Sequence, residues 1–193
     1  ITDVNQVKKI RGIGDSTFNK LKEFVDNGKV DMIEVAKSNP VNTFTEVYGI
    51  GPAKARELVD KHGITSIDEL RKNESLLNDK QKIGLKYYED ILKRIPRDEI
   101  DEYHALLTRH FKSLKIPTAS FDIVGSYRRG ASDSGDIDII ITDETGDTDV
   151  FKKFLDKLID EGIVIEVLSR GEVKSLAISQ LPTTRTSPRR TVR

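Results

Sequence analysis

Apolar positions in the first half of the chain recur with helical spacing, and those in the second half mix helical with strand-like spacing. Two short helices are predicted near the N-terminus, with apolar faces at Phe18, Leu21, Phe24 and Val25 and at Ala55, Leu58 and Val59. Residues 37–40, Lys-Ser-Asn-Pro, read as a linker between them. We therefore expect a helical N-terminal region built from two similar pieces.

Further elements follow along the chain. Ser66 is the predicted cap of a short helix, a longer helix is predicted for residues 78–93, and Pro96 ends it. Another helix, with Ile100, Tyr103, Leu106, Leu107 and Phe111 on one side, leads to Pro117. Strands are then predicted for residues 121–124, 136–142, 163–168 and 173–181, with a helix for 148–160. The second half is thus expected to be a sheet with helices.

A short repeat lies in the N-terminal region. Residues 7–14 and 45–52 both contain Gly-Ile-Gly, at Gly12 to Gly14 and at Gly49 to Gly51, and each leads into one of the predicted helices. Glycines permit a tight hairpin, and the amides at the start of the next helix can bind a phosphate without reading base sequence. The pattern is that of a helix-hairpin-helix motif. A purely structural connection is the alternative, and two copies in one apolar frame favour the motif.

Candidate chemistry appears around residues 124–138. Asp136 and Asp138 stand two apart at the start of a predicted strand, so both carboxylates would lie on one face while the isoleucines continue into a buried sheet. Two such carboxylates can share divalent metal. Gly125 leaves room for a phosphate, and Ser126 and Arg129 can bind phosphate oxygens. Asp-x-Asp alone is also ordinary turn chemistry, but a turn does not require the upstream Gly-Ser-x-x-Arg.

Composition narrows the partners. The 32 basic and 32 acidic residues balance, so contact with nucleic acid must be local rather than driven by net charge. Arginines 185, 189, 190 and 193 form a basic C-terminal run, which is either a disordered tail or a nucleic-acid contact. Cysteine is absent, which excludes a Cys-based zinc site, and no apolar run is long enough for a transmembrane helix. We expect a soluble intracellular protein without a membrane partner.

A series of short motifs carries a resemblance to a known family. In chain order they are Gly49-Ile50-Gly51-Pro52, Asp68-Glu69-Leu70-Arg71-Lys72-Asn73-Glu74, Ile83-Gly84-Leu85-Lys86-Tyr87, Lys93-Arg94-Ile95-Pro96-Arg97, Gly125-Ser126, Arg128-Arg129-Gly130, Ser134-Gly135-Asp136, Asp138 and Gln180-Leu181-Pro182. The chain resembles the family X DNA polymerases, most closely those of the polymerase beta type, over essentially its whole length. The resemblance implies a multidomain α and α/β protein, in which helical helix-hairpin-helix domains precede a nucleotidyltransferase palm with a mixed β-sheet.

The resemblance also implies three regions and an activity. Residues 1–38 correspond to the C-terminal part of a lyase-like helical domain, 39–97 to a helical DNA-binding subdomain, and 98–193 to an incomplete palm. The implied activity is gap-filling DNA synthesis in base excision repair, by transfer of dNMP to a primer 3′-OH. The implied partners are gapped or nicked duplex DNA and dNTP, with the protein acting as a monomer in the nucleus or wherever DNA is repaired.

Residue roles follow from the same likeness. Asp136 and Asp138 match the carboxylates that hold two Mg²⁺ ions. The matched nucleotide-binding positions are Gly125, Ser126, Arg129, Ser134, Gly135 and Arg94. Backbone carbonyls at Thr45, Val47 and Ile50, and at Lys8, Ile10 and Ile13, match ligands of a Na⁺ or K⁺ ion that bridges to DNA phosphate. The matched DNA contacts are Gly12, Gly14, Gly49, Gly51, Lys174 and Arg190.

Lys20 matches the Schiff-base lysine of the family's 5′-deoxyribose phosphate lyase. Read without the resemblance, Lys20 is one solvated helix lysine among several. The N-terminal helices that complete the family's lyase pocket have no counterpart, and phosphate-binding lysines of that pocket are replaced by Ser16 and Met32. The sequence therefore leaves the lyase activity as an expectation with an incomplete pocket.

Two departures concern the palm. The family carries a third carboxylate two residues after an Arg-Arg pair, as base toward the primer hydroxyl, whereas Thr191 and Val192 follow Arg189-Arg190 here. The family's nucleotide-selecting C-terminal subdomain has no counterpart, so we expect a polymerase truncated at both ends. Alternatives are a non-catalytic module that binds DNA gaps or ends and a template-independent nucleotidyltransferase.

Overall fold

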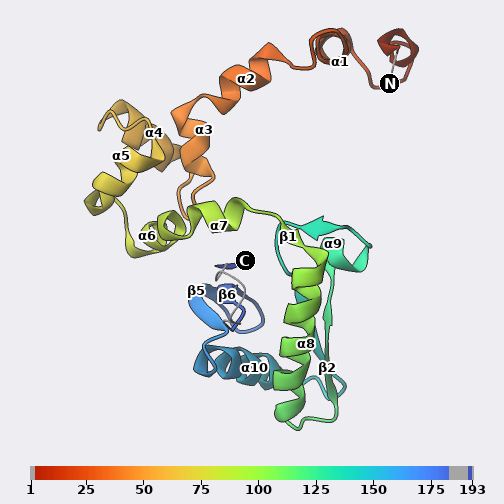
Figure 1. Ribbon diagram of the computed structural model, residues 1–193, viewed down its shortest axis with the longest axis vertical. Helices are drawn as coiled ribbons and strands as arrows, with labels where there is room; N and C mark the ends of the chain where they lie inside the picture. The colour runs from red at the N-terminus through yellow and green to blue at the C-terminus, as the bar shows by residue number, and fades with distance from the viewer. Residues whose placement is uncertain (1–2, 183–190, 193) are drawn as a thin grey trace. The chain divides into compact units, whose positions relative to one another are not determined.

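The computed structural model describes residues 3–182 and 191–192 (Figure 1). The chain divides into two compact units, one ending at Gln81 and one beginning at Lys82. Each unit has its own elements and its own buried side chains, and each is described by itself.

The first unit is helical. Its elements are the 3₁₀ helix η1 (Val4–Val7), α1 (Asp15–Asn27), α2 (Asp31–Lys37), α3 (Pro40–Thr45), α4 (Pro52–Asp60), α5 (Ile67–Lys72), the 3₁₀ helix η2 (Glu74–Leu76) and the start of α6 (Asp79–Lys86). The expected linker at residues 37–40 is shorter than predicted. Pro40 opens α3, because the fixed φ of proline suits the first helical position and Asn39 caps the helix by accepting a hydrogen bond from the Val41 amide at 2.9 Å.

The Gly-Ile-Gly repeat produces two hairpins with the same backbone. Gly12 and Gly49 have φ angles of 96° and 86°, in the left-handed region that favours glycine. Gly14 (φ −84°, ψ 171°) and Gly51 (φ −88°, ψ 173°) are the N-caps of α1 and α4. A sequence repeat has therefore become a structural repeat of helix, tight hairpin and helix.

The predicted Ser66 cap is present. The Ser66 hydroxyl accepts from the Glu69 amide at 3.2 Å, and Glu69 Oε2 accepts from the Thr65 amide at 2.8 Å. This reciprocal arrangement satisfies amides that the first turn of a helix leaves without a partner. The cap therefore fixes Ser66 as the residue at which the connection after α4 ends, directly before α5.

The predicted helix over 78–93 is two helices. α6 ends at Lys86 and α7 (Tyr88–Leu92) begins after Tyr87, whose φ of −105° and ψ of 14° depart from helical values. Tyr87 donates from its hydroxyl to Glu166 Oε1 at 3.4 Å. The break thus lies where the aromatic side chain turns toward β5.

The second unit combines helices with small sheets. After α7 it contains β1 (Ile95–Pro96), α8 (Arg97–Ser113), β2 (Ala119–Ile123), α9 (Gly125–Arg128), β3 (Asp133–Ser134), β4 (Ile139–Asp143), α10 (Asp149–Asp160), β5 (Val164–Arg170), β6 (Ser175–Gln180) and β7 (Thr191–Val192). The pairs β1–β3 and β2–β4 and the three-stranded sheet β5–β6–β7 are all antiparallel. The expected mixed sheet is therefore not found among the described residues, which form separate antiparallel sheets.

Aromatic side chains join α8, β2 and α10 into one core. The Phe111 ring lies 5.1 Å from that of Phe121 and 4.9 Å from that of Phe154, at angles of 49° and 83°. Such tilted and edge-on contacts are the favoured arrangements of packed aromatic rings. This core supports β2, which leads directly into the Gly-Ser turn (Figure 1).

One prediction about β4 was wrong. The strand begins at Ile139, so Asp136 and Asp138 precede it. Ile139 and Ile140 are 37% and 52% exposed, which contradicts the expected buried sheet. The physical reason is that β4 pairs with β2 alone, so part of its apolar surface stays open although Ile141 packs against the core.

Candidate functional site

The end of β2 and the segment before β4 are held together by backbone and side-chain contacts. The Val124 amide donates to the Asp138 carbonyl at 2.8 Å. Gly125 has a φ of 63°, and a Cβ placed on it would lie 2.2 Å from Asp138 Oδ2. Glycine is favoured here, because any other residue would be strained at this φ and its Cβ would force the Asp138 carboxylate to move. The sequence suggested that Gly125 makes room for a phosphate; the residue it makes room for in the structure is Asp138.

The two predicted carboxylates lie on an irregular segment. Asp136 is half-buried, Asp138 is exposed, and Ile137 between them packs against the core of the second unit. Among residues 3–182 and 191–192, no group of three or more His, Cys, Asp or Glu side chains could hold a metal. Two carboxylates nevertheless suit Mg²⁺, which is commonly held by one or two carboxylates together with water and substrate phosphates.

Two serines bridge the Gly-Ser turn and β3. The Ser126 hydroxyl donates to the Ser134 hydroxyl at 2.7 Å, and Ser134 is 1% exposed. The Ala131 amide donates to the Ser126 carbonyl at 3.1 Å and closes the loop between them. The structure thus brings the predicted residues Gly125, Ser126, Ser134 and Asp138 into one place.

Arg97, which sequence reasoning did not single out, forms hydrogen bonds to the loop between Ser126 and Ser134. Its Nη1 donates to the Tyr127 carbonyl at 2.9 Å and to the Ala131 carbonyl at 3.3 Å, and its guanidinium lies 4.2 Å from the Tyr127 ring centroid. The Tyr127 hydroxyl donates to Asp101 Oδ1 at 2.6 Å, and this hydrogen bond raises the pKa of Tyr127. The only sequence signal for Arg97 was its place at the end of the Lys-Arg-Ile-Pro-Arg run.

The remaining predicted nucleotide-binding residues surround the same loop. Arg129 is exposed at the end of α9, and Arg94 is exposed immediately before β1. Gly135 follows β3 and precedes Asp136, and a Cβ placed on it would lie 3.5 Å from Arg94 Nη1. Arg94 therefore lies beside the segment that joins Ser134 to Asp136, and Arg129 lies in the loop between the two serines.

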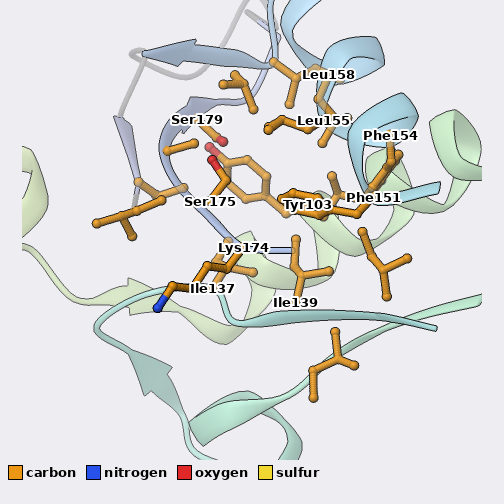
Figure 2. A pocket seen from close by; sticks show the side chains of 18 of the residues that line it. Tyr103, Ile137, Ile139, Phe151, Phe154, Leu155, Leu158, Lys174, Ser175 and Ser179 are labelled. Carbon is orange, nitrogen blue, oxygen red and sulfur yellow. The ribbon is translucent and has the colours of Figure 1, made fainter. Parts of the chain in front are cut away.

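An apolar pocket of about 370 Å³ lies next to this site (Figure 2). Figure 2 shows Phe151 and Leu155 of α10 on one side of it and Ile137 and Ile139 on another. Asp136 and Asp138 do not line it, so the apolar pocket is separate from the two carboxylates.

Val192 and Lys174 also line the apolar pocket. Val192 occupies the position at which the family resemblance implied a third carboxylate, and it is 2% exposed and pairs with Ser179 of β6. Lys174, a predicted DNA contact, is exposed in the turn between β5 and β6. The predicted contact Arg190 lies outside the described residues, as do the other arginines of the basic run.

The predicted residues of the first unit fall on the two hairpins and on α1. Of the predicted cation ligands, the Val47 carbonyl accepts from the Ile50 amide at 3.0 Å and the Ile10 carbonyl accepts from the Ile13 amide at 3.1 Å. A carbonyl oxygen has a second lone pair, so these bonds leave each able to bind a cation. The same hairpins carry Thr45 and Lys8, and Lys20 is exposed on α1.

Within the described part of the chain, no helix has the length and apolar character needed to cross a membrane.

Two protein-family models match consecutive parts of the sequence. Residues 42–92 match the fingers domain of DNA polymerase lambda, and residues 94–192, about half of the chain, match the DNA polymerase beta palm.

Three curated relatives are similar over most of this chain. DNA polymerase lambda of Arabidopsis thaliana is 39% identical over 163 residues, covering 82% of this chain and 30% of the relative. DNA polymerase lambda of Rattus norvegicus is 28% identical (94% and 33%), and the DNA polymerase type-X family protein pol4 of Schizosaccharomyces pombe is 27% identical (89% and 34%). The chain thus spans about a third of the length of the curated relatives it matches.

Proposed function

The chain belongs to family X of the DNA polymerases, and on that premise we propose that its second unit carries the nucleotidyl-transfer site of a gap-filling repair polymerase. The observation that supports the proposal best is the contact between Gly125 and Asp138. It joins the Gly-Ser turn, whose groups we propose to bind phosphate, to the Asp-x-Asp segment, whose carboxylates we propose to bind metal.

Asp136 and Asp138 are the proposed holders of two Mg²⁺ ions. When bound, Mg²⁺ polarises the α-phosphate, lowers the pKa of the primer hydroxyl and neutralises the leaving pyrophosphate. The chain's own part is to hold the carboxylates, and the Val124–Asp138 backbone bond and the packing of Ile137 do so. Asp136 and Asp138 therefore lie on either side of Ile137, whose side chain is packed against the core.

The proposed triphosphate site consists of Gly125, Ser126, Arg129, Ser134, Gly135 and Arg94. The Ser126–Ser134 hydrogen bond fixes one hydroxyl pair, and Arg97 fixes the loop that carries Ser126. Donors that are already in position bind a transferring phosphate more effectively than donors that must first be ordered. The loop is thus suited to binding the phosphates of an incoming dNTP.

The two hairpins of the first unit are the proposed contacts to duplex DNA at a gap or nick. Gly12, Gly14, Gly49 and Gly51 place backbone amides at the start of α1 and α4. Helix N-termini attract phosphate, and nearby carbonyls with a bound Na⁺ or K⁺ ion would add a positive charge. Lys174 and Arg190 are further proposed DNA contacts, and we propose that the protein acts as a monomer in the nucleus or wherever DNA is repaired.

A lyase function at Lys20 is a further part of the proposal. Its support is the match to the family's Schiff-base lysine and the exposure of Lys20 on α1, where a DNA 5′ end can reach it. A Schiff base between this amine and the C1 aldehyde of the sugar would form with release of water, and loss of a C2 proton to solvent would then break the C3–O bond and release the phosphate.

A second candidate function is non-catalytic binding to DNA gaps or ends. It is favoured by Val192, a buried aliphatic residue at the position where a third carboxylate was implied. That position offers no proton acceptor, whose loss typically lowers a rate by about 10²–10⁴-fold.

Nucleotide incorporation on a one-nucleotide gapped duplex separates the two functions. We expect template-directed extension with Mg²⁺, no extension with EDTA, and a decrease of at least about 100-fold in Asp136→Asn and Asp138→Asn, since loss of metal removes several kcal/mol of charge stabilisation. Asp156→Asn, on the exposed side of α10, is the matched control and should be fully active.

Fluorescence anisotropy with the same duplex should show unchanged DNA binding in all three variants. Full activity in Asp136→Asn would refute the metal assignment. No extension by the wild-type chain, together with intact binding, would establish the non-catalytic alternative.

A further inference from the structure

Arg94 is in contact with Asp133, 39 positions further along the chain, a residue that neither the motifs nor the family resemblance singled out. β1 and β3 are antiparallel, with Ile95 opposite Ser134 and Pro96 opposite Asp133. Arg94 precedes β1 and Gly135 follows β3, so the same pairing brings these two residues to one end of the ladder. The contact therefore lies at the edge of the proposed triphosphate site.

The carboxyl group and the backbone of Asp133 occupy one edge of the Arg94 guanidinium. Arg94 Nε donates to Asp133 Oδ1 at 2.8 Å, Nη2 lies 2.6 Å from the same oxygen, and Nη2 also donates to the Asp133 carbonyl at 3.0 Å. Three contacts from a planar group to one residue determine the orientation of that plane.

The other edge of the guanidinium faces Gly135. Arg94 Nη1 lies 3.5 Å from the position that a Gly135 Cβ would occupy. Because Gly135 has no side chain, this edge lies along the backbone that continues into Asp136. A guanidinium held in this way lies beside Gly135, one residue before the first of the two carboxylates that we propose as metal holders.

The Arg94–Asp133 ion pair is not expected to add much to the folding stability of the protein. The side chains of Arg94 and Asp133 are 59% and 48% exposed, and exposed pairs contribute little to folding. An arginine side chain has much rotamer freedom, however, and fixing it before a ligand arrives reduces the entropy lost on binding. The contact is therefore expected to affect ligand binding more than folding.

We propose that Asp133 is a positioning residue that holds the Arg94 guanidinium ready for the triphosphate of an incoming nucleotide. The inference rests on the proposed function for one point, the contact between Arg94 and the triphosphate. Asp133 itself does not touch the ligand, since its negative charge would repel phosphate.

The test compares binding of Mg²⁺–dATP and of inorganic triphosphate to the 193-residue chain by titration calorimetry. The variants are Asp133→Ala, Asp133→Asn and Arg94→Ala. Asp156→Ala is the matched control, because Asp156 forms an ion pair with Arg170 at the same 2.6 Å distance and with similar exposure, 54% and 42%, on α10 and β5.

We expect Asp133→Ala to weaken binding of both ligands about threefold to tenfold, in line with the cost of ordering one long side chain. Asp133→Asn keeps an acceptor for Nε and should bind within about twofold of wild type. Asp133→Ala should have no further effect once Arg94 is alanine, and all variants should keep the wild-type Tm. Unchanged affinity in Asp133→Ala, or failure of the wild type to bind triphosphate, would overturn the inference.

Two other outcomes are equally informative. Tighter binding by both Asp133 variants would show that the carboxylate competes with phosphate for Arg94, which also overturns the positioning role. Triphosphate binding that depends on Arg94 and Asp133, in a chain that incorporates no nucleotide, would support the inference while refuting the proposed polymerase activity of the same chain.

Discussion

The two Gly-Ile-Gly hairpins of the first unit have nearly the same backbone but differ in burial. Equivalent amides, those of Phe18 and Ala55, each donate at 2.9 Å to the carbonyl of the capping glycine. Yet Ile10 is 54% exposed, whereas Val47, its equivalent in the second hairpin, is 1% exposed. A repeated sequence therefore specifies the turn, while neighbouring elements specify how firmly the turn is held.

The difference comes from different surroundings. The buried cluster beside the first hairpin is small and consists of Val4, Val7 and Phe18. The second hairpin is supported by Gln81 of α6, whose Nε2 donates to the Gly49 carbonyl at 3.0 Å. Gln81 is itself held by two reciprocal hydrogen bonds with Asn78, both at 3.0 Å. If both hairpins bind DNA phosphate, the second presents the more rigid surface.

The two hairpins should differ most in the stability lost when the isoleucine at the centre of each is replaced by alanine. Ile50 is 4% exposed, whereas Ile13 is only half-buried. Ile50→Ala should therefore lower the free energy of unfolding by about 2–4 kcal/mol, and Ile13→Ala should lower it clearly less. Hydrogen exchange at the Ala55 and Phe18 amides reports each hairpin separately. Equal loss of protection in the two variants would contradict the comparison.

A smaller effect is expected from Gln81→Ala. The substitution removes the hydrogen bond to Gly49 and half of the cap of α6, which together are worth about 1–2 kcal/mol. Gln6→Ala, at an exposed position before the first hairpin, is the matched control and should stay within about 0.5 kcal/mol of wild type. Urea unfolding and gapped-duplex binding measure the two effects. Equal binding by both variants would show that Gln81 does not support the DNA contact.

The smallest effect concerns the cap that follows the second hairpin. Hydrogen bonds from the Thr65 amide and hydroxyl hold the pKa of Glu69 below its ordinary value of 4.5. A lowered pKa means that the stabilisation is fully present above pH 4.5 and is lost as the pH falls through the lowered value. Wild type should therefore exceed Glu69→Gln in Tm at pH 6, and the gap should close as the pH falls below 4.5. A gap that is constant with pH would assign the effect to shape rather than charge.

Local patterns accounted for much of the fold. The repeat, the Ser66 cap and the helix α10 depend on residues within a few positions of one another, so their spacing alone predicted them. The break at Tyr87 was missed because the apolar pattern continues through it. That break coincides with a hydrogen bond to Glu166 on a strand far along the chain.

The sequence proposed the residues of the candidate site, and their arrangement could not be deduced from it. Asp136 and Asp138 were chosen for a strand that begins only at Ile139, so the two-residue period did not place them. Their placement comes from Ile137 in the core and from Asp138 against Gly125. Arg97 and Asp133 were missed because their partners lie 30 or more positions away in the sequence, so neither residue carries a spacing signal of its own.

The sequence by itself determined the order of most elements, the two hairpin turns and the residues that match the family's motifs, because caps, turns and periodicity act over a few neighbouring residues. The tertiary structure decided which side chains meet: Gln81 with Gly49 across 32 positions, and Arg94 with Asp133 across 39. Such contacts depend on strand pairing and helix packing, whose free energy is summed over many residues distant in sequence. A short motif can therefore indicate which chemical groups the protein contains, whereas their relative orientation depends on the folded chain.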